Sequence, residues 1–233
     1  MSMRWVDNCG TLVPSVTTVA GWVAPIVFGT PTYEEISAKT WYDRGWCDSA
    51  LGTPTQSPSI SNAADKGTAI HKMIEEAING VKLENPPKQV DDAMDLVKGL
   101  REHGYRVRAE VKLSCLGGKI AGTADLVAVN PGSKIIRIYD WKTGEWYTTY
   151  PVQLGLLESA FYPLVMEGWR VDSYDHFLNG TPKEVIWEVP PGTVKLCHEV
   201  AKAARPPVGV HPAYSITQKY LDELNDWVAG VTR

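Results

Sequence analysis

The sequence has no uninterrupted apolar run approaching the roughly 18–20 residues that a membrane-spanning helix needs. Its N-terminus, MSMRWVDNCG, has no basic region followed by an apolar stretch, so we expect no secretory signal. The cysteines at positions 9, 47, 115 and 197 are far apart and form no CxxC pair. This spacing argues against a zinc site, and a chain of this length does not require disulfides. A reducing, cytoplasmic environment is the simplest expectation.

A broad basic surface is also excluded, because 23 Lys and Arg residues face 27 Asp and Glu residues, for a net charge of −4. Such a balance is unlike that of a protein that coats nucleic acid, although a narrow basic track around an acidic pocket is compatible with it. The sequence contains no GxxxxGK[ST] phosphate-binding loop, no internal repeat and no low-complexity linker. Its 233 residues are 44% hydrophobic, which suffices for one domain with a sizeable core.

The periodicity of apolar residues changes along the chain. Residues 1–61 are rich in turn formers and predict an irregular segment. Helical spacing begins at Asn62, stops at Asn79-Gly80, and returns from Gln89 to His103. Three strands joined by short turns are then predicted at 105–114, 119–129 and 134–142. Connections as short as these predict an antiparallel meander.

Pro151 suits the first turn of a further helix over 151–168, which Pro163 should kink or divide. Two more strands (171–179, 184–190) and two closing helices (193–204, 217–231) complete the predicted elements. This order predicts a single α/β (α+β) domain with a central mixed sheet flanked by helices. We divide it into an irregular segment (1–61), a core (62–190) and C-terminal helices (191–233).

An acid and a base end the last strand of the meander in the sequence IRIYDWKTGE. Because side chains alternate along a strand, Asp140 and Lys142 share one face and Trp141 points the other way. Asp125 interrupts the apolar run of the preceding strand, and Glu110 does the same one strand earlier. The hairpin pairing can therefore bring several carboxylates together.

Buried carboxylates that lie close together repel and are costly to desolvate, and a divalent cation relieves both costs. Oxygen-rich clusters suit Mg²⁺, Mn²⁺ or Ca²⁺, and an adjacent lysine can orient water or stabilise charge on a phosphate. The alternative is an ordinary ion pair between Asp140 and Lys142 at the strand end, with Asp125 an acid near a turn. D-x-K by itself does not decide between them.

Other polar residues extend this cluster. His71 and Glu75 are four residues apart on one helical face, after Gly67-Thr68, a pairing that permits close backbone approach. Gln153, in the first turn of the helix after the D-x-K strand, could donate to a phosphate or to water. Each residue also has a purely structural alternative. His71 could be a histidine whose hydrogen bonds are made within the protein, Glu75 a solvated surface acid and Gln153 an exposed glutamine.

Taken together, these residues resemble the PD-(D/E)XK nuclease superfamily, in particular its RecB-type exonuclease branch. The matching segments, in order over residues 67–162, are GTAIH (67–71), AE (109–110), AGTADLV (121–127), YDWKTG (139–144) and VQLGLLESAFY (152–162). VPSVTTV (13–19) is similar to the entry segment of phage members of this group. The resemblance implies a restriction-endonuclease-like core.

The resemblance also implies roles for individual residues. His71, Asp125 and Asp140, with the carbonyl of Trp141, would ligate one or two Mg²⁺ or Mn²⁺ ions. Lys142 would be the catalytic lysine, Gln153 the glutamine of the following helix, and Glu110 an active-site acid. Two features depart from the family. Leu157 stands where a tyrosine is usual, and Tyr162 is displaced from that position. The cysteines that hold an iron–sulfur cluster in some members are missing, so we expect no such cluster.

The implied substrate is DNA, hydrolysed at phosphodiester bonds from an end, with single strands favoured, in phage-type recombination, replication or repair. Lys72, Lys112 and Lys119 are candidate phosphate contacts, and Trp146, Tyr147 and Tyr150 are candidates for stacking on bases. A single-strand annealing protein or a helicase would be a separately encoded partner, and the location would be the host cytoplasm if the protein is viral. The alternatives are a structure-specific endonuclease of the same fold and a non-catalytic module that binds DNA or a partner.

Overall fold

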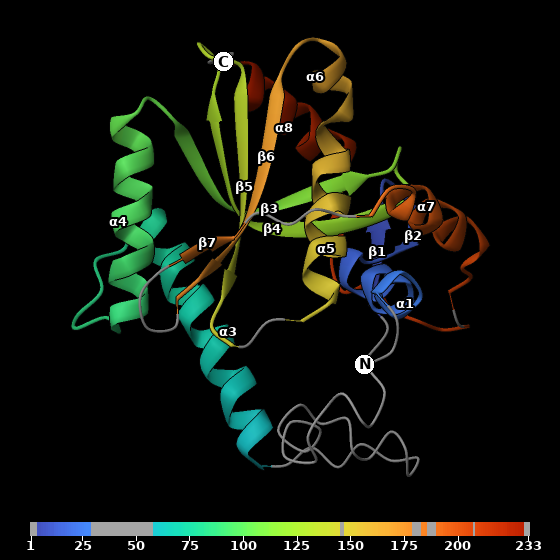
Figure 1. The fold of residues 1–233 in the computed structure, drawn as a ribbon, viewed down its shortest axis with the longest axis horizontal. Coiled ribbons are helices and arrows are strands. Elements are labelled where there is room, and N and C mark those ends of the chain that lie inside the picture. Colours follow the sequence, from blue (N-terminus) through green and yellow to red (C-terminus); the bar gives the residue numbers. More distant parts are fainter. Residues whose placement is uncertain are drawn as a thin grey trace.

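The computed structural model describes residues 4–28, 58–144, 147–178, 183–185, 190–206 and 208–230, with backbone alone for 58–64 and Lys183. These residues form a mixed α and β fold with two mixed β-sheets flanked by helices (Figure 1). The predicted fold class is confirmed at this level. None of the helices in the described ranges has both the length and the apolar character required to cross a membrane.

The larger sheet, within the described residues, has the strand order β3-β4-β5-β6-β7. The strands are β3 (Arg106–Cys115), β4 (Ile120–Asn130), β5 (Ile135–Lys142), β6 (Arg170–Phe177) and β7 (Lys183–Val185). The first three pair antiparallel through short turns, which confirms the predicted meander. β6 is parallel to β5 and β7 is antiparallel to β6. A parallel neighbour requires a crossover connection between β5 and β6.

That crossover contains α5 (Thr149–Glu158), a 3₁₀ turn (Ser159–Phe161) and α6 (Tyr162–Met166). Pro163 lies at the start of α6, so the predicted helix is divided where proline removes a backbone donor. The helix begins two residues before Pro151, at Thr149. Gln153 therefore lies in the second turn of α5, and its predicted place in the first turn was wrong.

Helices cover both faces of the larger sheet (Figure 1). One face packs against α3 (Pro58–Ile78) and α4 (Lys88–Glu102). The other packs against α1 (Val16–Phe28), α5, α7 (Thr193–Ala203) and α8 (Gln218–Ala229). Alternation along β4 supplies both cores, because Leu126 faces α3 and α4 whereas Val127 faces the opposite layer.

The N-terminal segment is more regular than the sequence predicted. β1 (Trp5–Asn8) and β2 (Thr11–Pro14) form an antiparallel hairpin through Cys9 and Gly10, both at positive φ, and α1 follows directly. β8 (Ser215–Ile216) adds to β1 in parallel and completes the smaller sheet. The prediction of an irregular segment was therefore wrong for residues 5–28 and for residues 58–61, which begin α3, whereas residues 29–57 lie outside the described part.

Gly122 sets how closely α1 approaches the larger sheet. A Cβ atom at this position would lie 2.6 Å from Val16 Cγ2 and 3.0 Å from Leu157 Cδ2. Only glycine leaves room for the start of α1 against β4. Because Val16, Thr17 and Gly122 also line the cavity described next, this contact helps to shape its wall.

Candidate active site

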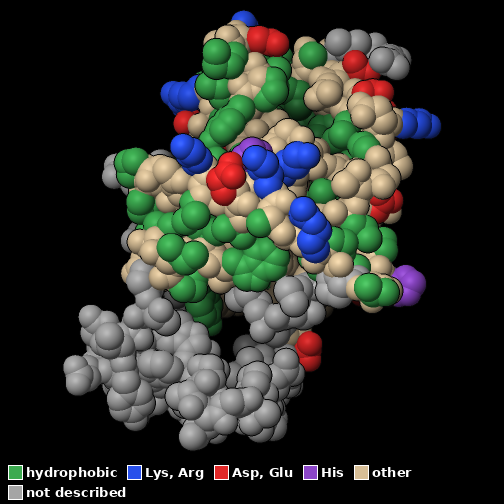
Figure 2. Space-filling view, turned by 90° about the vertical axis from the view of Figure 1, so that its right-hand side faces the viewer, with side chains coloured by type: hydrophobic (Ala, Val, Ile, Leu, Met, Phe, Trp, Pro, Cys, Tyr) green, Lys and Arg blue, Asp and Glu red, His purple; other side chains and the backbone are tan. Residues whose placement is uncertain are grey.

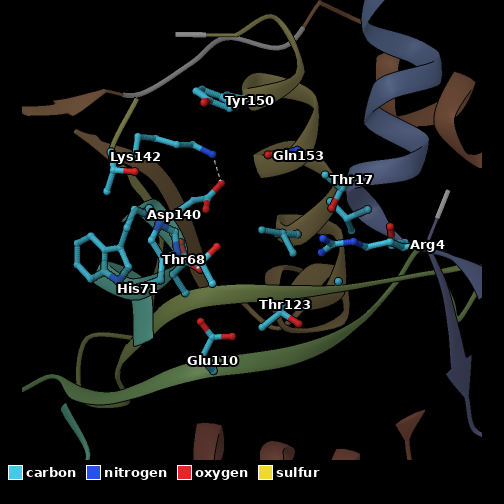
Figure 3. A pocket seen from close by; sticks show the side chains of 18 of the residues that line it. Arg4, Thr17, Thr68, His71, Glu110, Thr123, Asp140, Lys142, Tyr150 and Gln153 are labelled. Atoms are coloured by element: carbon cyan, nitrogen blue, oxygen red, sulfur yellow. Dashed lines mark hydrogen bonds and ion pairs between the residues drawn. The ribbon is translucent and has the colours of Figure 1, made fainter. Parts of the chain in front are cut away.

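A cavity of about 1000 Å³ lies between α1, α3, α5 and the strands β3, β4 and β5 (Figure 3). The structure brings most of the sequence-predicted site residues into its wall: His71, Lys72, Glu110, Asp125, Asp140, Trp141, Lys142, Tyr147, Tyr150 and Gln153. Glu75 lines the same cavity. Residues from a helix, three strands and a second helix therefore converge on one place, as the sequence pattern predicted.

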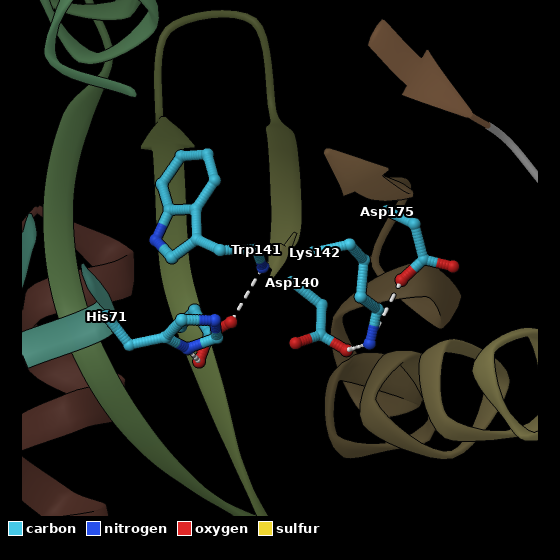
Figure 4. Close-up of polar contacts among 6 residues, drawn as sticks. His71, Asp140, Trp141, Lys142 and Asp175 are labelled. Carbon is cyan, nitrogen blue, oxygen red and sulfur yellow. Dashed lines mark hydrogen bonds and ion pairs between the residues drawn. The ribbon is translucent and has the colours of Figure 1, made fainter. Parts of the chain in front are cut away.

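His71 and Asp125 meet although they lie on different elements. α3 packs on one face of the larger sheet, and His71 Nδ1 lies 3.4 Å from Asp125 Oδ1 on β4. The other carboxylate oxygen of Asp125 accepts a hydrogen bond of 2.6 Å from the backbone N–H of Trp141 (Figure 4). Asp125 thus has a defined position between α3 and β5.

Asp140 and Lys142 form an ion pair and hydrogen bond on one face of β5 (Figure 4). The predicted alternation is confirmed, because Trp141 points to the opposite face, is 2% exposed and packs in the core beneath α3 and α4. Lys142 is only 7% exposed, although lysine is rarely buried unless it is paired. The ion pair of the alternative interpretation is thus present at the end of β5, but it is largely buried and lies in the wall of the cavity.

The carboxylates of the cavity are crowded. Burial, together with the nearby charge of Asp140, raises the pKa of Asp125 to about 6, although His71 partly offsets this. Burial and the charges of Asp125 and Glu75 raise the pKa of Glu110 to about 7. Burial is the larger cause of each increase, and the neighbouring carboxylates add to it.

The pKa values of the two basic groups are also raised, but by the nearby carboxylates and against the effect of burial. Burial by itself would lower the pKa of Lys142, but the charges of Asp140 and Asp175 outweigh it and raise that pKa. The pKa of His71 is likewise raised, because Asp125 overcomes the effect of burial. Lys142 is therefore an ammonium ion at neutral pH and acts as a cation and hydrogen-bond donor rather than as a base.

Glu110 has an unusual backbone conformation for a strand residue, with φ of +48°. It stands opposite Asp125, between the register pairs Ala109–Leu126 and Val111–Ala124. The left-handed region costs energy for a residue other than glycine, and such conformations cluster at functional sites. The deviation turns Glu110 toward the cavity that the other carboxylates line (Figure 3).

The donor set has the chemistry of a divalent-cation site, with carboxylate oxygens and one imidazole beside crowded negative charge. Within the described residues, however, no group of three or more His, Cys, Asp or Glu side chains is already gathered at metal-binding geometry. The contacts give the reason: Lys142 holds Asp140, while Trp141 and His71 hold Asp125. A bound cation would have to replace the contacts of His71 and Lys142 with these two carboxylates.

The residues predicted to contact DNA are distributed unevenly. Lys72, Tyr147 and Tyr150 line the cavity, and the two tyrosine rings meet edge to face with centroids 5.4 Å apart. Lys112 and Lys119 do not line it, and the ammonium of Lys112 lies over the ring of Tyr214. Trp146 lies outside the described residues.

Two charged residues of the site were missed by the sequence reasoning. Arg4 reaches into the cavity from the segment before β1, on the side of Thr17 and Gln153 (Figure 3). Asp175 is fully buried on β6, with Oδ1 3.4 Å from Lys142 Nζ. Asp175 could have been recognised as an acid within the predicted strand 171–179, whereas no local sequence pattern indicates that Arg4 belongs to the site.

Comparison with models of known protein families gave no match, and a search of curated proteins found no significant relative.

Proposed function

We propose that this protein is a divalent-metal-dependent deoxyribonuclease of the PD-(D/E)XK type, in the RecB-like branch. Its reaction is the hydrolysis of DNA phosphodiester bonds from an end, with single-stranded DNA favoured. A restriction-endonuclease-like core belongs to the same proposal. An antiparallel meander, a crossover helix and a parallel strand beside the D-x-K strand support it.

One observation carries the proposal: Asp125, Asp140 and Lys142 line a single cavity, with the lysine ammonium bonded to the Asp140 carboxylate. A cation next to a pair of acids on neighbouring strands suits a reaction in which negative charge increases on a phosphate. An ordinary structural ion pair would not explain why His71, Glu110 and Gln153 line the same cavity. We base the assignment on this combination.

Asp125, Asp140 and His71 would hold the cation, with the Trp141 carbonyl as a further oxygen donor. When bound, Mg²⁺ or Mn²⁺ supplies Lewis-acid activation of water and charge neutralisation at the phosphate. Lys142 then stabilises charge on the phosphate oxygens or orients the attacking water through its N–H groups. Gln153 donates its amide N–H groups on the side of α5, and Glu110 extends the acidic wall.

The attraction of DNA to such a cavity must come from local cations. Arg4 and Lys72 stand at the wall of the cavity, on the sides of α1 and α3. Across the face that bears α1 and α7, Lys and Arg side chains alternate with acidic and apolar ones (Figure 2). The described part of this face therefore presents no broad basic surface (Figure 2).

Tyr147 and Tyr150 favour a single-stranded end, because aromatic rings at the cavity wall can stack on unpaired bases. A role in phage-type recombination, replication or repair completes the proposal. It includes a separately encoded annealing protein or helicase as partner and a cytoplasmic location, that of the host if the protein is viral.

The test is cleavage of end-labelled single-stranded DNA with Mg²⁺, Mn²⁺ or EDTA. We expect the wild type to release nucleotides with either metal and not with EDTA. Asp125→Asn and Lys142→Met should each lower the rate by at least about 100-fold. The controls are Asp92→Asn and Lys88→Met, because these residues form an ion pair of 2.6 Å on α4, with an exposed lysine and away from the cavity.

Undiminished activity in both site variants would refute the assignment of the site. Cleavage of circular single-stranded DNA would show an endonuclease instead, since a circle offers no end. Metal-independent binding of DNA without cleavage by the wild type would identify a non-catalytic module.

A further inference from the structure

The ammonium group of Lys142 has surroundings that strand alternation alone does not provide. Asp140, two residues earlier, is its partner on the same strand. Asp175 on β6 presents Oδ1 at 3.4 Å from Lys142 Nζ (Figure 4). On another side, the ring of Tyr150 from α5 covers the ammonium, with its centroid 3.6 Å from Nζ. Two carboxylates and an aromatic face thus surround one cation.

The parallel register of β5 and β6 determines this arrangement. Asp140 is paired with Asp175 and Lys142 with Phe177, so the two acids stand side by side on neighbouring strands. The side chain of Lys142 extends back along β5 to lie between them. Asp175 is 0% exposed, which makes it the most deeply buried carboxylate of the group.

A carboxylate buried this completely is costly unless a positive charge compensates it. Lys142 supplies that charge. Asp175 in turn holds Lys142. If Asp140 turns to hold a cation, Lys142 loses its nearest partner. Asp175 is too deeply buried to follow, so it would keep the ammonium close to its present position. Tyr150 adds a cation–π contact to the ammonium on the side of α5.

We propose that Asp175 is a positioning residue, and that Asp175 together with Tyr150 holds the Lys142 ammonium in place for catalysis. This inference rests on the proposed nuclease function and deepens it. Asp175 acts only through Lys142, and Tyr150 acts on the lysine as well as at the wall where DNA would lie. The alternative is that Asp175 is a purely structural acid of β6, whose loss would affect folding without a specific link to Lys142.

The first test compares Asp175→Asn with the wild type in steady-state cleavage of single-stranded DNA. Asparagine keeps the shape of the side chain but removes the charge that holds the ammonium. We expect kcat to fall about 10- to 100-fold with KM changed less than about threefold, because the loss concerns the transition state rather than DNA binding. Asp172→Asn is the control, since Asp172 lies on the same strand and pairs with the exposed Arg170 at 2.8 Å. An unchanged kcat in Asp175→Asn would overturn the proposal.

Tyr150 provides a second pair of variants that does not depend on the folding of Asp175→Asn. Tyr150→Phe retains the ring above the ammonium, whereas Tyr150→Leu removes it. We expect kcat to fall about 3- to 30-fold in the leucine variant and to stay within about twofold in the phenylalanine variant. Equal kcat values in the two variants would contradict a role for the ring.

A readout without DNA or metal separates this inference from the proposed function. Urea unfolding in EDTA is measured for Asp175→Asn, Lys142→Met and the double variant. If the two side chains act together, the double variant should lose less stability than the sum of the single losses. Strict additivity would overturn the positioning role. If the wild type cleaves no DNA, the nuclease proposal fails, while the unfolding cycle still decides whether Asp175 and Lys142 are coupled.

Discussion

The imidazole Nδ1 of His71 on α3 lies 3.4 Å from Oδ1 of Asp125 on β4. This contact joins the helical layer to the meander at the place where Asp140 and Lys142 end β5. Two groups that would share a cation therefore face each other already. Binding of that cation would exchange their mutual contact for coordination.

Metal binding can be measured on the protein without any substrate. We expect Mn²⁺ at about 100 times its dissociation constant to raise the free energy of unfolding by about 2.7 kcal/mol, with EDTA reversing the effect. Asp125→Asn should abolish the corresponding increase in Tm, and His71→Gln should reduce it more for Mn²⁺ than for Mg²⁺, because imidazole is the softer ligand. Asp92→Asn serves as the control. Equal stabilisation of all variants would show that the cation binds elsewhere.

Arg4 offers a test of how DNA is attracted. Arg4→Gln removes a cation that faces the cavity. We expect weaker DNA binding for every sequence tested and a reduction of about 1 in the slope of log K against log salt concentration. Fluorescence anisotropy at several salt concentrations measures both. Lys119→Gln, in the turn after β3 and outside the cavity wall, should leave the slope unchanged.

Gly122 tests the link between α1 and the sheet. Gly122→Ala forces a Cβ atom against Val16 and Leu157, so we expect a loss of about 1–3 kcal/mol in the free energy of unfolding. Gly99→Ala is the matched control, because a Cβ atom there meets nothing within 4 Å. Gly99 lies inside α4, so alanine should stabilise the protein by about 0.5–1 kcal/mol. Urea denaturation distinguishes the two signs.

His176 should make stability depend on pH. It is buried on β6, its ring meets Trp141 edge to face, and no described residue hydrogen-bonds its ring nitrogens. Burial lowers its pKa below 6.5, although the charges of Glu184 and Asp92 partly oppose this. The unfolded state therefore binds the proton more tightly than the folded state does.

The sign of the effect follows from that difference. The stability associated with neutral His176 is complete above pH 6.5 and is lost as the pH falls through the lowered pKa. Relative to His176→Phe, the wild type should lose about 1.4 kcal/mol for each unit by which the pKa is lowered. Urea unfolding between pH 5 and about 8 measures the difference between the two proteins. A difference that does not vary with pH would contradict the prediction.

Much of the candidate site could be predicted because its signals are local. Alternation along a strand determines that Asp140 and Lys142 share a face and that Trp141 is buried behind them, and the structure agrees. Short turns determine that β3, β4 and β5 pair as a meander, which places Asp125 next to β5. Helical spacing determines that His71 and Glu75 share one face, and both line the cavity.

The N-terminal hairpin was missed because its strands are short and its stability is not local. β1 and β2 each have four residues, and their turn residues resemble those of a loop. Val6 and Val13 are buried against Ile216, which belongs to a strand at the other end of the chain. A pattern in residues 5–14 cannot reveal a partner so far away.

Only the tertiary structure shows that Asp175 and Arg4 belong to the site. The sequence determined, through short-range periodicity, which side chains share a face of each strand and helix. The parallel register of β5 and β6 is set by a crossover helix and by packing on both faces, so the sequence alone did not place Asp175 beside Lys142. The position of Arg4 depends likewise on how the smaller sheet and α1 pack against β4. Local patterns therefore predicted the acids and the lysine of IRIYDWKTGE, and long-range packing supplied the second acid that surrounds that lysine.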